Sequence, residues 1–535
     1  MKNAVLIILS LIAISTALMP QGKKTARKTE TAARYTPKIY KDFAIKNRID
    51  ELVLAKLEEK RIKPAEAVND ETFLRRVYLD ITGTIPQSTD VRKFLDSTDQ
   101  HRREKVVDAL LASEEHIDYL TMKWLDLLRV RSEFPINLWP NAVQAYHRWI
   151  REAVVSNMAY DRFARELITA SGVNFRDPPV NFYRAIPRKE PLVIAQAVAL
   201  TFLGARTDKW PKDEALGFAA FFSKLAYKST MEWKEEIIYY DPDKKPLMGT
   251  NGVPVQPLLP DGTKIAYDMA LDPRMQFADW LITPENPWFA KAIVNRVWYW
   301  YLGRGIIHEP DDIRDDNPPA NAELLAWLEK DFIAHKYDMK YLIRQILNSG
   351  TYQLASKPAE NTPTNDIYFS RYYIRRIDAE VIIDALCRIT GTTESYSSPV
   401  PEPFTYIPED QTSVRLNDGS ITSSFLEMFG RPSRDSGAEM ERNNRPSAAQ
   451  ELHLLNSSHV QDKLRRRTPL RRVLTQARTP EKQVEELYLS ILSRFPTAEE
   501  KEIALEHMKA NARNNDGIGD IAWALVNASE FILKH

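Results

Sequence analysis

Apolar residues recur at helical spacing on both sides of a short acidic loop in the second half of this chain. Before the loop they are Ile293, Val294, Val297, Trp298 and Tyr301, and after it they are Leu324, Leu325, Leu328 and Phe332. A period of about 3.6 residues predicts two amphipathic helices. Gly303 suits the left-handed cap that ends a helix, and Asn321 suits the N-cap that begins one.

The same spacing recurs along most of the chain, and the composition supports it. Glycine accounts for only 17 of the 535 residues, about half its usual share, which leaves long stretches free of this helix-destabilising residue. Further helices are predicted at 116–130, 141–157, 161–170, 192–203, 447–466, 481–492, 498–511 and 519–534. We therefore expect a mainly α-helical protein.

Two irregular stretches interrupt this helical pattern. Residues 241–263 hold five prolines and three glycines, a density that cannot sustain a helix. We therefore place a Pro/Gly-rich linker at 241–266, between an N-terminal helical domain at 42–240 and a C-terminal helical domain at 267–535. Residues 392–424 predict a long loop or a small irregular or β insertion in the second domain, and loops of that length are often functional.

The first residues have the features of a secretory signal. Lys2 precedes an apolar run from Ala4 to Leu18, which is long enough for a signal core and short for a bilayer span. We interpret residues 1–22 as a signal peptide and the basic, polar residues 23–41 as a disordered tether. The expected location is periplasmic or extracellular, with no membrane span after cleavage. A retained membrane anchor is the alternative.

Charge and cysteine content narrow the classes of function. Basic and acidic residues number 73 each, so the basic footprint typical of nucleic-acid binding is missing and no nucleic-acid partner is expected. Cys387 is the only cysteine, which excludes an internal disulfide and a cysteine-based metal site. Its apolar neighbours predict a small core residue. The sequence also lacks HExxH, GxSxG, GxGxxG and GxxxxGK[ST] motifs.

Several separated motifs resemble the planctomycete cytochrome-c-like family, which consists of exported bacterial proteins with two domains of unknown function in tandem. FLRRVYLDITGTIP at 73–86 and KWLDLLRVR at 123–131 are similar to the N-terminal domain. Four further segments are similar to the C-terminal domain: residues 295–352, RRIDAEVIIDAL at 375–386, FGRPSRD at 429–435 and ELHLLNSSHV at 451–460. The resemblance covers nearly all of the chain after the tether.

Two cysteine motifs found in many members of that family are missing from this chain. A Cys-x-x-Cys-His motif lies in those members between two flanks that remain here at 202–204 and 217–222, but the residues between them are ARTDKWPKDEAL. A Cys-Glu-Cys-Glu-Arg motif is replaced by residues 438–442, AEMER. Covalent haem needs two thiols and a histidine, so covalent haem is excluded and no cofactor is predicted. The loss of both cysteine motifs from this chain suggests that the two motifs form one metal or haem site in the family.

The stretch 430–446 gathers charged residues that are candidates for a site. An extended backbone would place Glu439 and Glu441 on one side, where two carboxylates can act as acid and base in glycoside hydrolysis. Asp435 is a third catalytic candidate. Arginines of this stretch can instead bind a carboxylate or sulfate group through paired N–H groups; they are Arg431, Arg434 and Arg442. A structural ion-pair network between the domains is the alternative.

The acidic loop between the two helices described first is a second candidate site. Oxygen ligands in a tight loop suit Ca²⁺, and this loop offers Asp311, Asp312, Asp315, Asp316 and Asn317. The spacing does not match an EF-hand loop. The structural alternative is capping of the following helix together with pairing to Arg304 and Arg314.

Tryptophans provide a third possible binding feature, because indole rings can stack on sugars. They are Trp139, Trp149, Trp210, Trp233, Trp288, Trp298 and Trp300, and packing in the core is the alternative. From these features we expect an exported, non-haem binding or assembly protein whose partner is a protein or a polysaccharide. The alternative function is that of a carboxylate-dependent hydrolase acting on a glycan.

Overall fold

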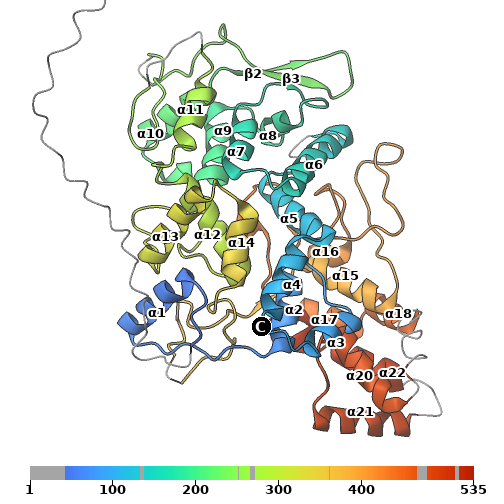
Figure 1. The fold of residues 1–535 in the computed structure, drawn as a ribbon. Helices are drawn as coiled ribbons and strands as arrows, with labels where there is room; N and C mark the ends of the chain where they lie inside the picture. The colour runs from blue at the N-terminus through green and yellow to red at the C-terminus, as the bar shows by residue number, and fades with distance from the viewer. Residues whose placement is uncertain are drawn as a thin grey trace, which may run out of the picture. The chain divides into compact units, whose positions relative to one another are not determined.

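The computed structural model describes residues 43–132, 138–250, 252–265, 271–360, 362–466, 477, 479–511 and 517–535. The predicted signal peptide at 1–22 and tether at 23–41 lie outside these residues. All described residues belong to one compact unit, so contacts between its first and second halves can be described directly. The described fold is mainly helical with small sheets, which confirms the predicted fold class (Figure 1).

Helices dominate the first half of the described chain. They are α1 (Arg48–Lys60), α2 (Asp70–Ile81), α3 (Ser88–Leu95), α4 (Arg102–Leu111), α5 (Glu114–Leu127), α6 (Pro140–Val155), α7 (Tyr160–Ile168), α8 (Asn181–Arg184), α9 (Pro191–Val198) and α10 (Lys212–Ala219). A π-helical turn, η2 (Ala199–Leu203), continues α9, so the helix predicted at 192–203 is present with a wider last turn.

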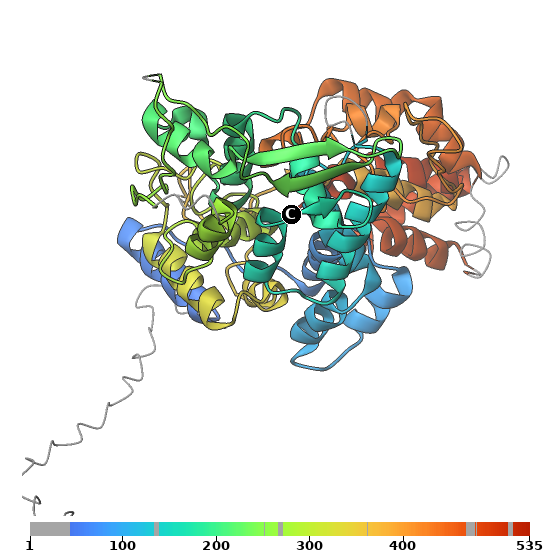
Figure 2. The ribbon, with the colours of Figure 1, turned by 90° about the horizontal axis from the view of Figure 1, so that it is seen from above.

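A small antiparallel sheet lies in this otherwise helical half. Its order is β1–β3–β2, formed by β1 (Gly172–Val173), β2 (Leu225–Ser229) and β3 (Glu236–Tyr240). Leu225 pairs with Tyr240 and Ser229 with Glu236. Arg184 of α8 fixes β3 to the helices through an ion pair with Glu236 at 2.8 Å. Figure 2 shows the long hairpin of β2 and β3 seen from above.

The second half of the described chain is again mainly helical. Its helices are α11 (Pro273–Leu281), α12 (Phe289–Leu302), α13 (Ala322–Ala334), α14 (Met339–Leu347), α15 (Ala379–Thr390), α16 (Ser424–Met428), α17 (Ala448–Asn456), α18 (Ser458–Arg466), α20 (Pro480–Ile491), α21 (Ala498–Ala510), α22 (Gly517–Val526) and α23 (Ser529–Ile532). Two short strands, β4 (Arg375–Arg376) and β5 (Leu533–Lys534), pair antiparallel.

Helix boundaries follow local sequence signals in several places. The Asn321 side chain accepts a hydrogen bond from the backbone N–H of Leu324, as an N-cap does. Gly303 ends α12 with a φ of +79°, a conformation that glycine adopts without steric cost. The single helix predicted at 447–466 is wrong, because Ser457 takes an extended conformation between α17 and α18.

The hydrophobic core around α15 draws on both halves of the chain. Fully buried residues of α15, including Ile382 and Leu386, pack in one cluster with Leu79 of α2 and with Tyr119 and Met122 of α5. The C-terminal strand returns to the same region, where Lys534 donates to the buried carboxylate of Asp80 at 2.8 Å. The two halves are therefore held together by shared core packing and by buried charge pairs.

Among the described helices, none combines the length and the apolar character required to span a bilayer.

Candidate functional site

Arg442 and Arg434, predicted to bind a ligand, are paired with carboxylates inside the protein. Arg442 donates to Glu380 of α15 at 2.7 and 3.1 Å and to Asp126 of α5 at 2.6 Å. Arg434 donates to the other oxygen of Asp126 at 2.9 Å. Burial acts to lower the pKa of Arg442, but the carboxylates of Glu380 and Asp126 hold it well above its ordinary value. This network joins α5 to α15.

Arg431 is also engaged within the protein. Its guanidinium donates to the carbonyl oxygens of Ile421 at 2.6 Å and Asp418 at 3.2 Å, and its Nε lies 3.5 Å from Glu380. Burial lowers its pKa to about 10. Ligand binding by these three arginines stays a prediction, and their observed contacts are those of a structural network.

Glu439 and Glu441 lie on one 3₁₀ turn, η5 (Glu439–Glu441), so the extended strand predicted for them is wrong. The Glu441 carboxylate accepts the backbone N–H groups of Asp435 and Ser436 at 2.9 and 3.0 Å. Burial acts to raise its pKa, but the hydrogen bonds from Ser436 and Asp435 lower it overall. Asp435 forms an ion pair with Arg131 at 2.5 Å.

The Glu439 carboxylate is held beside α12. It accepts a hydrogen bond from Nε1 of Trp300 at 2.7 Å and lies 3.6 Å from Nε of Arg296. The backbone N–H of Glu439 donates to Asp311 at 2.6 Å. Burial raises the pKa of Glu439 to about 7, with Arg296 opposing the rise and Asp311 adding to it. Glu439 therefore exchanges its proton near neutral pH in the folded protein.

The raised pKa of Glu439 predicts a pH-dependent stability. In the folded protein Glu439 keeps a proton that the unfolded chain releases above about pH 4.5. The stabilisation that this proton provides is therefore full below that pH and is lost as the pH rises through about 7. Glu439→Gln keeps an oxygen acceptor for Trp300 and removes the titration. In urea unfolding, we expect the free energy of unfolding of the variant, relative to that of the natural protein, to rise by on the order of 2–3 kcal/mol from pH 5 to pH 8. A constant difference across this range would contradict the prediction.

The segments that replace the two missing cysteine motifs lie in contact. Arg206, in the first segment, donates from Nη2 to the sulfur of Met440 in the second at 3.2 Å. The same nitrogen lies 3.9 Å from a carboxylate oxygen of Glu309 in the acidic loop. This contact supports the hypothesis that the two motifs form one site in relatives that carry them.

The acidic loop directs its carboxylates toward arginines. Asp311 is buried and pairs with Arg296 at 2.7 Å, while Asp312 and Asp316 each lie 3.2 Å from Arg314. The other two candidate ligands do not join these carboxylates. Asp315 is exposed, and Asn317 donates to backbone carbonyls within the loop. Within the described residues, no cluster of three histidine, cysteine or acidic side chains could hold a metal ion. Calcium binding by this loop stays a prediction.

The tryptophans proposed for sugar stacking occupy different environments. Trp298 is completely buried and Trp300 is 8% exposed, so both belong to the core. Trp233 is 68% exposed at the turn between β2 and β3. Trp139 lies beside Phe404, with their ring centres 5.3 Å apart. Trp233 is therefore the one exposed ring of the seven, while Trp139, Trp149, Trp210 and Trp288 are half-buried.

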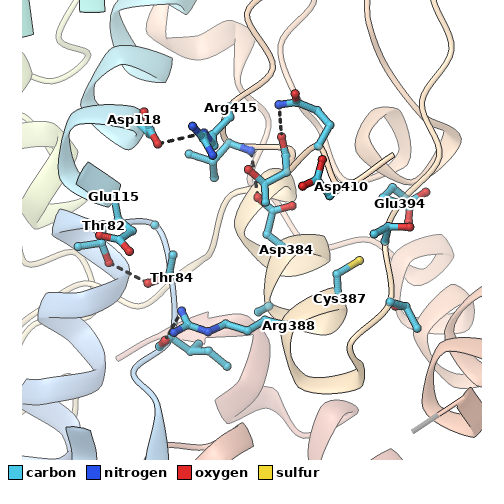
Figure 3. A pocket seen from close by; sticks show the side chains of 18 of the residues that line it. Thr82, Thr84, Glu115, Asp118, Asp384, Cys387, Arg388, Glu394, Asp410 and Arg415 are labelled. Carbon is cyan, nitrogen blue, oxygen red and sulfur yellow. Dashed lines mark hydrogen bonds and ion pairs between the residues drawn. The ribbon is translucent and has the colours of Figure 1, made fainter. Parts of the chain in front are cut away.

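A cavity of about 620 Å³ lies between the two halves of the described chain (Figure 3). One wall comes from the turn after α2 and the start of α5, and the other from α15 and the segment that follows it. The lining residues come from four separate stretches, at 82–85, 114–118, 384–396 and 410–415. Sequence reasoning missed this cavity because no local motif unites these stretches.

Asp384 occupies a central place in the cavity wall. It projects from α15, and its two carboxylate oxygens accept the backbone N–H groups of Ser413 at 2.7 Å and Val414 at 3.0 Å. These bonds fix the orientation of the carboxylate. Burial raises its pKa to about 6, although the hydrogen bonds from Val414 and Ser413 act to lower it. Cys387, one helical turn further along α15, also lines the cavity.

Glu394 links the cavity wall to a pair of histidines. Its carboxylate lies 2.8 Å from Nε2 of His459 and 3.1 Å from Nζ of Lys463, while Nδ1 of His459 lies 3.3 Å from His453. Lys463 also lies 3.5 Å from the sulfur of Cys387. Burial raises the pKa of Cys387, which disfavours the thiolate. The side chain is half-buried and lines the cavity, so it is not the buried core residue that was predicted.

A second cavity of about 300 Å³ adjoins the first. The two share six lining residues: Asp118, Asp410, Gln411, Thr412, Val414 and Arg415. The second cavity is otherwise lined by Pro408 and by side chains of α5 and α6, among them Thr121, His147 and Arg151. Burial lowers the pKa of His147 to about 4, so this ring is neutral at physiological pH.

Comparison with known families locates two matches in tandem. Residues 48–227 match PSCyt2, described as a protein of unknown function (DUF1549). Residues 273–508 match PSD1, also described as a protein of unknown function (DUF1553). No curated protein and no solved structure matches the chain. The two matched regions each contribute one wall of the larger cavity.

Proposed function

Because the chain belongs to the planctomycete cytochrome-c-like two-domain family, whose domains have no assigned activity, we propose a function from its cavity. The protein is an exported, non-haem binding protein that takes a glycan between its two family domains. The predicted signal peptide supports export, and N-terminal sequencing tests it. A mature chain that begins near residue 22 supports export, and retention of Met1 contradicts it.

The cavity is the observation that carries this proposal. Its volume lies within the range of about 300–1,000 Å³ that small-molecule sites occupy, and ligand sites often lie between domains. Its wall offers hydroxyl groups that can exchange hydrogen bonds with a sugar; they belong to Thr84, Thr392, Thr393 and Thr412. The Thr82 hydroxyl in the same wall is buried and donates to the carbonyl oxygen of Tyr78. Tyr396 adds an aromatic ring, and such rings provide flat apolar surface for a sugar face.

A variant that obstructs the cavity tests this proposal. Thr393 lies on the exposed rim, so Thr393→Trp adds bulk there without disturbing the core. Isothermal titration with neutral, sulfated, acidic and amine-bearing oligosaccharides should detect binding to the natural protein. We expect Thr393→Trp to weaken the observed binding by roughly tenfold or more, because a large side chain displaces ligand contacts worth over 1 kcal/mol.

Thr364→Trp is the matched control, since Thr364 is exposed and does not line the cavity. It should bind like the natural protein. Equal affinity of the Thr393 variant and the natural protein would place the glycan elsewhere and contradict the proposal, as would the absence of binding to every oligosaccharide.

A glycan hydrolase is the second candidate function, favoured by one observation. Glu439 and Glu441 lie on the same turn with pKa values displaced in opposite directions, as the acid and base of a hydrolase require. Against it, Glu441 uses its oxygens for hydrogen bonds within its own loop. Loss of measured glycan turnover in Glu439→Gln, with folding intact, would favour the hydrolase over the binding protein.

A further inference from the structure

Carboxylates outnumber cationic side chains around the larger cavity. Two arginines line it, Arg388 and Arg415, against six carboxylates: Glu114, Glu115, Asp118, Asp384, Glu394 and Asp410. Asp118 is paired with Arg151 and Arg415, Glu114 with Arg151, and Glu394 with Lys463 and His459. Arg388 donates to the carbonyl oxygen of Ile85 at 3.2 Å. Three carboxylates without an ion pair therefore face one arginine without an ion pair, Arg388, among the described lining residues, and the cavity keeps an excess of negative charge.

Those three are Glu115, Asp384 and Asp410. Among the described residues, none of them forms an ion pair with an arginine, lysine or histidine. Glu115 and Asp410 are exposed, whereas Asp384 is half-buried in the wall with its carboxylate held by two backbone N–H groups. Figure 3 shows Asp384 and Glu115 on opposite walls. A cleft with an excess of one sign of charge concentrates ligands of the opposite sign.

The adjoining cavity holds an independent sign of a polar ligand. Thr121 is 1% exposed and lines this second cavity, and its hydroxyl has no hydrogen-bond partner within the described structure. Buried hydroxyl groups are normally paired, because an unpaired one loses hydrogen bonds to water. A ligand hydroxyl in the second cavity would satisfy it once the Thr121 side chain turns toward that cavity, because its oxygen has almost no exposed surface. The two cavities adjoin at Asp118 and 410–415, and one elongated ligand would cross the ion pair between Asp118 and Arg415 to occupy both.

We propose that the ligand is an oligosaccharide of at least two sugar units that carries a free primary amine. Its ammonium group pairs with Asp384 in the larger cavity, while Asp410 and Glu115 contribute negative potential at the opening. The neighbouring unit extends toward Thr121 in the second cavity. This inference rests on the proposed function and names the class of glycan.

The arrangement of the carboxylates favours an ammonium ion over a metal ion. A hard metal ion requires several oxygen ligands on one centre, and the described residues contain no group of three such side chains placed to hold one. An ammonium group can be bound by a single carboxylate, with its other protons donated to nearby hydroxyl or carbonyl oxygens. The threonine hydroxyls around this cavity favour a sugar over a simple alkyl amine.

Titration with four matched probes tests the proposal: a glucosamine tetramer, an N-acetylglucosamine tetramer, a glucose tetramer and spermidine. The glucosamine tetramer should bind roughly tenfold to a hundredfold more tightly than the other two tetramers, as a charge-assisted hydrogen bond predicts. Spermidine should bind more weakly than the glucosamine tetramer, because it lacks sugar hydroxyls. Equal binding by spermidine would overturn the assignment of a glycan.

Asp384→Asn tests the position of the amine. Asparagine removes the charge and keeps one oxygen acceptor, but its NH2 group faces the second backbone N–H group, so urea unfolding must first show that the variant is folded. The preference of the folded variant for the glucosamine tetramer should disappear. Asp279→Asn is the matched control, because Asp279 is exposed and lies outside both cavities. Retained preference in Asp384→Asn would overturn the assignment.

The same titrations separate this inference from the function on which it rests. Equal affinity for the three tetramers would overturn the assignment of an amine to the ligand and leave glycan binding intact. No binding of any tetramer would overturn both.

Discussion

Replacing Arg442 with alanine is expected to lower the free energy of unfolding by about 3–5 kcal/mol. Arg442 is 9% exposed and pairs with Glu380 and Asp126, which are 0% and 16% exposed. Removing the guanidinium leaves two carboxylates in a poorly solvated site with fewer partners, and an uncompensated buried charge is costly. Because Asp126 lies on α5 and Glu380 on α15, the loss also weakens the junction between the two family domains.

Urea unfolding at neutral pH measures this effect, and a surface pair provides the control. Arg162 pairs with Glu166 one helical turn away, and its side chain is 70% exposed. Arg162→Ala should therefore cost less than about 1 kcal/mol. If Arg442→Ala cost no more than this control, the network would have no structural role, and a ligand-binding role for Arg442 would become the better interpretation.

Trp298→Ala is expected to destabilise the protein by a similar amount, about 3–5 kcal/mol. The Trp298 side chain is fully buried on α12 and packs edge-on against Phe369, with ring centres 5.1 Å apart. Alanine would leave a cavity that the surrounding helices cannot fill completely. The midpoint and slope of urea unfolding report the change in stability.

Two companion variants separate loss of packing from other effects. Trp298→Phe keeps an aromatic ring and removes an indole N–H that has no hydrogen-bond partner within the described structure, so its loss should stay below about 2 kcal/mol. Trp233→Ala removes a ring that is 68% exposed and should change stability little. Equal losses for Trp298→Ala and Trp233→Ala would contradict the core assignment.

The helices could be predicted from sequence because their signals are local. The apolar stripe around Trp298, the Gly303 cap and the Asn321 cap each act within one or two helical turns, and the structure contains all three. Helix breaks were harder, because the extended conformation of Ser457 depends on how α17 and α18 pack. The β2–β3 hairpin was missed because the whole first domain was interpreted from its helical pattern.

The candidate sites depended on contacts that sequence spacing does not contain. Glu439 was expected on an extended strand, but its backbone N–H donates to Asp311, far away in sequence, and the chain forms a 3₁₀ turn. The cavity around Asp384 is built from four stretches of two domains. Nothing in the helical segment that contains Asp384 distinguishes a cavity wall from a solvent-exposed face.

The decisive measurement is a crystal structure of the mature protein with the glucosamine tetramer. We expect ligand density in the cavity between α5 and α15, with a ligand nitrogen about 3 Å from a carboxylate oxygen of Asp384 and a second sugar unit near Thr121. Density on another surface, such as the exposed ring of Trp233, with the cavity holding no sugar, would contradict this expectation.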